Sequence, residues 1–175
     1  VSFVFAAVVY GMTMESTGSF WDCGEFVSGC FKLQVVHPPG APFFLMLGRL
    51  FTLFSGGDPL VNGTGGNVAV TVNFMSALAT AGAVMFTFWT VTALAKKFVF
   101  SDGNYTTGRI ITVLGAGLVA AASCTFLDSL WFSAVEGEVY ALSQFFMSLI
   151  FWAIMKWDSD ESKYADHWLV IIAYM

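Results

Sequence analysis

VAVTVNFMSALATAGAVMFTFWTVTALA, residues 68–95, is the stretch that decides the fold of this chain. It contains no charged residue over 28 positions. A helix needs about 20 apolar residues, at about 1.5 Å each, to cross the hydrocarbon core of a bilayer. The stretch therefore predicts a membrane-spanning helix.

The composition of the whole chain agrees with a lipid environment. Of its 175 residues, 57% are hydrophobic and only 11% are charged, whereas soluble domains are about one quarter charged. Too few polar groups are present to cover a soluble surface. We therefore expect an all-α polytopic membrane protein with a single transmembrane domain, and four further apolar runs as spans or parts of spans: 1–12, 110–126, 139–157 and 168–175.

The two ends of the chain suggest a longer protein. The sequence begins at Val1 without an initiator Met and ends inside the apolar run 168–175. We interpret it as an N-terminal part, in which 1–12 is the end of a first span.

A long polar segment, 13–67, separates the first span from the second. It contains the apolar run 42–54, which is too short to cross a bilayer easily and carries Arg49 near its middle. We expect this run to be a helix that either lies along the membrane interface or packs beneath the bundle.

The basic residues predict the orientation. Five of the seven follow the second or the fourth span: Lys96, Lys97, Arg109, Lys156 and Lys163. Short loops rich in Lys and Arg stay in the cytoplasm. The segment 13–67 and the loop 128–138, both rich in carboxylates, then face the periplasm or a lumen.

Two classes of function are disfavoured. No basic patch with interleaved aromatic residues indicates nucleic-acid binding. The three cysteines show no Cys/His spacing typical of zinc sites. Cys23 and Cys30 are either ordinary apolar residues or a disulfide pair in an oxidising compartment.

The acids of the first outer segment are candidates for chemistry. Asp22 and Glu25 are three residues apart, which places them on one face of a helix. Such a pair can act as a general base or bind a divalent cation. The same spacing also fits a capping box, with Asp22 at the N-cap and Glu25 at the third helical position.

The sequence HPPG, residues 37–40, predicts a rigid turn that holds His37 in one direction. Arg49 on the following helix needs a partner near lipid, either a phosphate or an acid. Glu138 lies next to the fourth span, where a charged carboxylate is costly, so we expect it to have a functional or structural role. Hydrogen bonds between helices explain the polar residues of the second span: Thr71, Asn73, Ser76 and Thr80.

Three motifs in order carry a resemblance: ESTGSFWDCGEF (15–26), KLQVVHPPGAP (32–42) and DSLWFSAVEGEVYAL (128–142). Together they resemble the DUF2723 family, also called glycosyltransferase family 117, which is related to TMEM260-like protein O-mannosyltransferases. The likeness covers nearly the whole chain. The wider architecture is similar to the GT-C membrane glycosyltransferases, whose first outer loop carries an acidic catalytic motif.

The resemblance implies transfer of a sugar, mannose by preference, from a polyprenyl-phosphate donor to Ser or Thr hydroxyls of exported proteins. It implies Asp22 as the catalytic base, with Glu25 as a second catalytic carboxylate. One departure is the Cys-Gly pair between these acids, where related enzymes have adjacent Asp and Glu. The residues assigned to donor or substrate binding are Glu15, Lys32, His37, Arg49, Glu136 and Glu138.

We expect an integral protein of the bacterial inner membrane, with its site facing the periplasm and lipid, donor and acceptor as its partners. No cofactor is certain, although a divalent cation is possible at the acids. The alternative is a membrane transporter or lipid-handling protein that uses the outer-loop acids as an ion or substrate site.

Overall fold

A computed structural model describes residues 1–56, 67–162 and 164–174. Throughout these residues the regular structure is helical. The sequence-based predictions for segment 57–66, Lys163 and Met175 lie outside the described residues. The helices are α1 (Ser2–Thr13), α2 (Cys23–Lys32), α3 (Pro42–Thr52), α5 (Val68–Val99), α6 (Thr107–Thr125), α7 (Asp128–Val135), α8 (Val139–Ser159) and α9 (His167–Tyr174).

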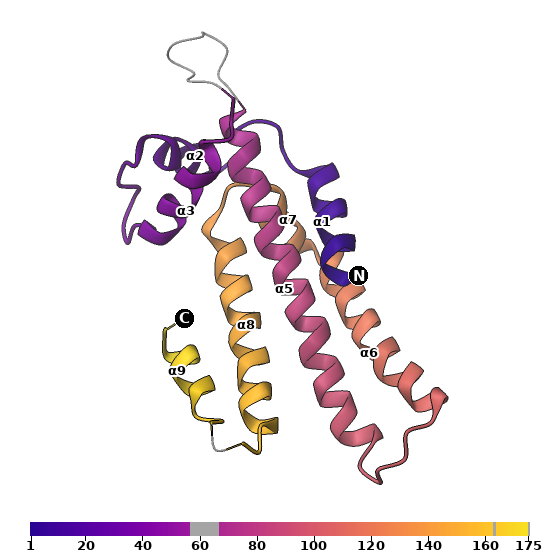
Figure 1. The fold of residues 1–175 in the computed structure, drawn as a ribbon. Coiled ribbons are helices and arrows are strands. Elements are labelled where there is room, and N and C mark those ends of the chain that lie inside the picture. The colour runs from indigo at the N-terminus through magenta and orange to yellow at the C-terminus, as the bar shows by residue number, and fades with distance from the viewer. Residues whose placement is uncertain (57–66, 163, 175) are drawn as a thin grey trace.

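Helix α5 is the centre of the bundle (Figure 1). Helices α8 and α6 pack along opposite sides of it, and α1 lies on the same side as α6. Small side chains such as Ala77 and Ala81 are fully buried where α5 meets α1, which lets the helix backbones approach closely. The hydroxyl of Tyr10 on α1 donates a buried hydrogen bond of 3.0 Å to the carbonyl oxygen of Thr125 on α6.

Three helices, α5, α6 and α8, are long and apolar enough to cross a membrane. The chain is therefore an integral membrane helix bundle. Helices α1 and α3 are apolar but shorter.

The spanning helices extend slightly beyond the predicted runs. Helix α5 continues four residues past position 95, so Lys96 and Lys97 lie in its last turn and not in a loop; Lys156 similarly lies in the last turn of α8. Lysine is a good helix former, and its charge is favourable at a helix C-terminus.

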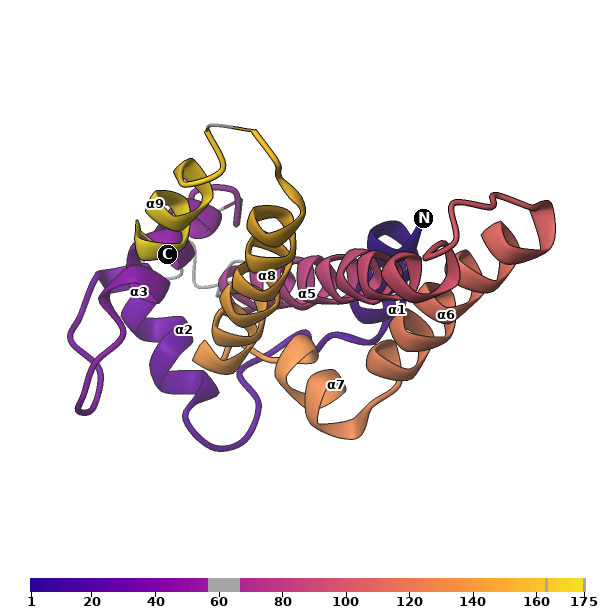
Figure 2. The same cartoon turned by 90° about the horizontal axis from the view of Figure 1, so that it is seen from below.

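The outer segment forms two helices, α2 and α3, that pack against each other and against one end of α5 (Figure 2). Their shared core includes Phe26, Cys30 and Phe44. The helices are in close contact at Gly48, where a Cβ atom would overlap the Cys30 sulfur. Glycine at this position is therefore needed for the packing of α3 on α2.

Candidate functional site

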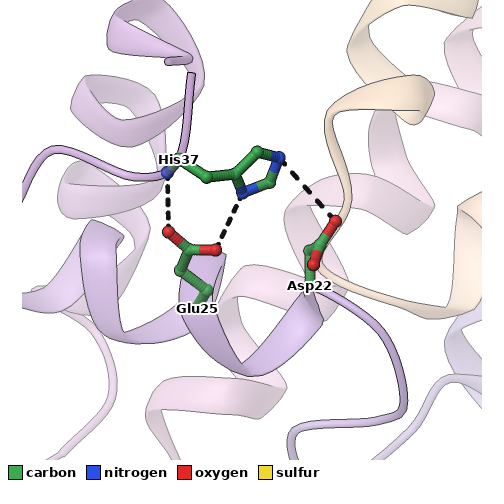
Figure 3. A group of neighbouring side chains, drawn as sticks. All are labelled: Asp22, Glu25 and His37. Carbon is green, nitrogen blue, oxygen red and sulfur yellow. Dashed lines mark hydrogen bonds and ion pairs between the residues drawn. The ribbon is translucent and has the colours of Figure 1, made fainter. Parts of the chain in front are cut away.

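Three side chains of the outer segment form one polar group: Asp22, Glu25 and His37 (Figure 3). Asp22 lies at the N-terminal boundary of α2, Glu25 lies in its first turn, and His37 lies in the connection to α3. The two oxygens of Glu25 accept hydrogen bonds from the backbone N–H of His37, at 2.7 Å, and from its Nδ1, at 2.8 Å. The His37 Nε2 atom faces an Asp22 carboxylate oxygen at 3.8 Å. The structure thus brings His37, which the sequence singled out separately, together with the predicted pair of acids.

The backbone around His37 explains why the imidazole is held in place. The N–H of Gly40 donates a 2.9 Å hydrogen bond to the His37 carbonyl oxygen, which closes the turn. Gly40 has a φ of +81°, a conformation that glycine adopts without strain. The neighbouring Val36 is buried, and the ring of Phe26 contacts the imidazole edge to face, with 5.8 Å between centroids. The predicted rigid turn is therefore built from both local bonds and packing.

The charges of this group favour one another. The hydrogen bond with Glu25 raises the pKa of His37 above its ordinary value. The same bond and the one from the His37 backbone lower the pKa of Glu25. The side chains of His37, Asp22 and Glu25 remain 46%, 55% and 41% exposed, respectively, so solvent and a ligand can reach them.

The capping-box interpretation is wrong for these residues. Asp22 occupies the N-cap position of α2, but its side chain accepts no capping hydrogen bond. Glu25 does not reach back to the N-cap, because both of its oxygens are engaged by His37. The Asp22 carboxylate makes no hydrogen bond within the described part of the chain, and its nearest charged partner is His37.

Two buried acids, Glu136 and Glu138, lie between α7 and α8. Glu136 is 4% exposed and accepts a 2.6 Å hydrogen bond from the Ser19 hydroxyl. Glu138 is 5% exposed. Burial first, and then the negative charges of Asp22 and Glu136, raise the pKa of Glu138 to about 7. Its carboxyl group can therefore hold or release a proton close to neutral pH.

Asn73 of α5 fastens the loop that leads to Asp22. Its amide nitrogen donates to the carbonyl oxygens of Glu15, at 2.8 Å, and Thr17, at 3.2 Å. The sequence interpretation assigned Asn73 to bonds between spanning helices, because polar residues in an apolar run most often serve that purpose. The position of Asn73 in the second turn of the span, next to the outer loop, is the sequence signal that could have indicated the loop instead.

The cysteine alternatives are also resolved. Cys23 and Cys30 are both buried free thiols. The interpretation as ordinary apolar residues is confirmed, and the disulfide alternative is wrong.

The predicted cationic residues Lys32 and Arg49 lie away from Asp22. Lys32 is in the last turn of α2, and the guanidinium of Arg49 donates a 2.6 Å hydrogen bond to the carbonyl oxygen of Phe31. Ten residues of helix separate this end of α2 from Asp22, which corresponds to about 15 Å. Glu15 is exposed and is held through its backbone, whose N–H donates to the Val135 carbonyl oxygen at 3.0 Å.

The group of three has the composition of a possible cation site. Asp22, Glu25 and His37 each offer one ligand atom, and these atoms lie within 4.8 Å of one another. A divalent cation would compete with the proton that His37 shares with Glu25, because both need the same lone pairs.

Comparison with known proteins gives the family. Residues 22–175 match the family described as Protein O-mannosyl-transferase TMEM260 N-terminal domain. The chain belongs to this family. The match begins at Asp22 and includes the three polar residues of Figure 3.

Two curated relatives carry the same name. The chain is 26% identical over 148 residues to Protein O-mannosyl-transferase tmem260 of Dictyostelium discoideum, which covers 85% of the chain and 15% of that relative. It is 29% identical over 149 residues to Protein O-mannosyl-transferase TMEM260 of Mus musculus, covering 85% of the chain and 18% of that relative. The chain thus spans less than one fifth of the length of these relatives. No solved structure matches it.

Both relatives are eukaryotic. They give no support to the expected bacterial inner membrane or to a periplasmic orientation. What stands is that the chain is an integral membrane protein of a family named for protein O-mannosyl transfer.

Proposed function

We propose that this chain is the N-terminal part of a GT-C-type membrane enzyme that transfers mannose from a polyprenyl-phosphate donor to Ser or Thr hydroxyls of exported proteins. The names of the two relatives support mannosyl transfer to protein. The ordered outer-loop motifs support a donor site on the non-cytoplasmic side of the membrane.

The observation that carries the proposal is the Asp22 carboxylate beside a fixed imidazole. The Asp22 side chain is exposed, its carboxylate makes no hydrogen bond with any described residue, and it faces the Nε2 of His37. A carboxylate in this state can take the proton of an acceptor hydroxyl as the hydroxyl oxygen attacks the anomeric carbon. Asp22 is therefore the proposed general base.

The leaving group is a polyprenyl phosphate, which departs as an anion when the bond between the anomeric carbon and the phosphate oxygen breaks. No general acid is required for this departure. Protonated His37 is the cation nearest to Asp22 and would stabilise the charge that develops on the phosphate. Glu25 then serves as a positioning residue, because it orients the imidazole and keeps it protonated.

His37 takes the cationic role in preference to Arg49 and Lys32. The guanidinium of Arg49 is engaged by the Phe31 carbonyl oxygen and lies 5.3 Å from the centre of the Phe31 ring. We therefore assign Arg49 to joining α3 to the end of α2. Lys32 remains a candidate for a more distant part of the donor, and Glu15, Glu136 and Glu138 for the acceptor side of the site.

The transporter alternative expects acids within the spans. In α5, α6 and α8, as the structure describes them, charged residues lie only in the terminal turns. This distribution favours the enzyme.

The test uses the full-length protein in liposomes, with radiolabelled polyprenyl-phosphate mannose and a Ser/Thr acceptor peptide. Label on the peptide hydroxyl is the expected result. Movement of intact donor between leaflets, with no label on the peptide, would support the lipid-handling alternative instead.

A further inference from the structure

The last turns of α5 and α8 lie at the end of the bundle opposite to α2 (Figure 1), and residues of these turns line two cavities. One cavity there has a volume of about 350 Å³ and is lined by Lys96, Lys97, Lys156, Tyr105, Trp152 and Ser159, among others. A second cavity of about 330 Å³ shares Lys96, Trp152 and Lys156 with the first. The two cavities share these residues and are treated together as one groove, whose lining includes three lysines.

Two of these lysines carry uncompensated charge. Lys97 forms an ion pair with Asp158. Lys96 has no hydrogen bond or ion pair with any described residue, and the Lys156 ammonium lies 5.6 Å from the centre of the Trp152 ring without a carboxylate partner. The carbonyl ends of α5 and α8 carry partial negative charge, so an anion at this place depends on the lysines to hold it.

The inner part of the groove is apolar. The second cavity extends to Trp89 and Thr92 on α5. Trp89 precedes Lys96 by seven residues, which places it about 10 Å farther into the span. The rings of Trp89 and Trp152 lie with their centroids 5.5 Å apart and form an aromatic wall there.

We propose that this groove binds one anionic phospholipid, with its phosphate on Lys96 and Lys156 and one acyl chain against Trp89 and Trp152. Basic pockets between spanning helices on the cytoplasmic side are suited to such headgroups. The aromatic wall next to the lysines favours a lipid over free phosphate, because a free phosphate ion would contact the lysines alone. This site is separate from the proposed sugar transfer and does not depend on it.

The experiment is native mass spectrometry of the delipidated full-length protein in detergent. Phosphatidylglycerol and phosphatidylcholine with identical acyl chains are titrated in parallel, and inorganic phosphate is the competitor. Each lysine near a membrane surface contributes roughly a fivefold change in affinity for an anionic headgroup. We therefore expect the K96Q/K156Q variant to bind phosphatidylglycerol about 30-fold more weakly, and K96Q alone to show about a fivefold loss.

Two variants are the controls. K96R/K156R keeps both charges and is expected to retain binding. R109Q removes one charge from the same end of the bundle, but Arg109 does not line either cavity and pairs with Asp102, so this variant is expected to bind normally. Melting curves verify that each variant is folded, and K96Q serves if the double variant is not.

Three results would overturn the proposal. The first is equal affinity of native protein and K96Q for phosphatidylglycerol, and the second is an equal loss in R109Q. The third is displacement of the lipid by millimolar inorganic phosphate, which would indicate a site for free phosphate.

Discussion

Glu25 holds His37 with both of its carboxylate oxygens, one on the backbone N–H and the other on Nδ1. A bidentate contact of this kind fixes the direction of the imidazole as well as its charge. The opposite nitrogen, Nε2, is thereby turned toward Asp22. The base and the cation of the proposed reaction are thus set side by side by a third residue.

Replacement of the proposed base should abolish transfer without unfolding the protein. We expect Asp22→Asn to lower kcat by at least about 100-fold, the lower range for general base catalysis. Its melting temperature should change little, because the Asp22 side chain makes no hydrogen bond in the described structure. Asp128→Asn, the same change at an exposed acid of α7, is the matched control. Near-normal turnover in folded Asp22→Asn protein would remove Asp22 from the mechanism.

Loss of the Glu25 carboxylate should lower the pKa of His37. The bond with Glu25 is the largest cause that raises this pKa, and Glu25→Gln removes its charge. If protonated His37 assists the leaving phosphate, transfer falls as pH rises through its pKa, and Glu25→Gln moves that fall to lower pH. An NMR titration of the imidazole in a His167→Gln background measures the pKa of His37 alone, since the sequence contains two histidines. An unchanged pKa would contradict the assigned positioning role.

The same pair should stabilise the fold over a limited pH range. The pKa of Glu25 is lowered, so its contribution is present above its ordinary value of 4.5 and is lost as pH falls through the lowered value. The pKa of His37 is raised, so its contribution is present below 6.5 and is lost as pH rises through the raised value. Both contributions are fully present between pH 4.5 and pH 6.5. The difference in melting temperature between native protein and Glu25→Gln should therefore be greatest in this range.

Glu138→Gln should stabilise the protein at alkaline pH. Burial raises the pKa of Glu138 from 4.5 to about 7, so the native protein loses stability as pH rises across this interval. Above pH 7 the loss of unfolding free energy approaches about 3 kcal/mol. The uncharged Gln variant does not suffer this loss. Unfolding of the purified protein at pH 5 and pH 8 tests this, with the exposed Glu161→Gln as control. Equal stability of native protein and Glu138→Gln at pH 8 is the contrary outcome.

Asn73→Leu should loosen the loop that carries Asp22. The change removes two hydrogen bonds to loop carbonyl groups from a fully buried position and should cost about 2–4 kcal/mol. Thr71→Val is the control, because among the described residues the Thr71 hydroxyl bonds only to the Val68 carbonyl oxygen of its own helix. Thermal unfolding measures the cost. An effect no larger than that of Thr71→Val would show that the loop is held by other contacts.

Gly48→Ala should disturb the packing of α3 on α2. The new Cβ would lie 2.2 Å from the Cys30 sulfur, and overpacking of this kind costs about 1–3 kcal/mol. Gly115→Ala in α6 meets nothing within 4 Å and should stabilise its helix by up to about 1 kcal/mol. Melting temperatures that move in the same direction for both variants would contradict the close contact.

The spans could be predicted from the sequence because hydropathy is a local property. An uncharged run such as 68–95 forms a helix in lipid because a helix satisfies its own backbone hydrogen bonds, and α5 is that helix. The rigid turn after His37 was equally readable, because proline restricts its own backbone and that of its neighbour.

The partners of the polar residues could not be predicted in the same way. Glu25 and His37 are 12 residues apart. They meet because α2 ends at Lys32 and the next residue, Leu33, adopts a left-handed conformation that turns the chain. The capping pattern at Asp22 was a local signal, and this tertiary contact overrode it. Arg49 similarly found a backbone carbonyl group of α2, which no spacing rule encodes.

The length of α5 sets the height of the proposed site relative to the membrane. Its 32 residues span about 48 Å, whereas the hydrocarbon core is about 30 Å thick. With Lys96 and Lys97 at one boundary, the first turns of the helix, including Asn73, stand among the lipid headgroups on the other side. A membrane-anchored sugar phosphate diffuses in that same layer. Under the proposed function, the donor would reach Asp22 by lateral diffusion within this layer, and a change in bilayer thickness would change the height of the site relative to the donor.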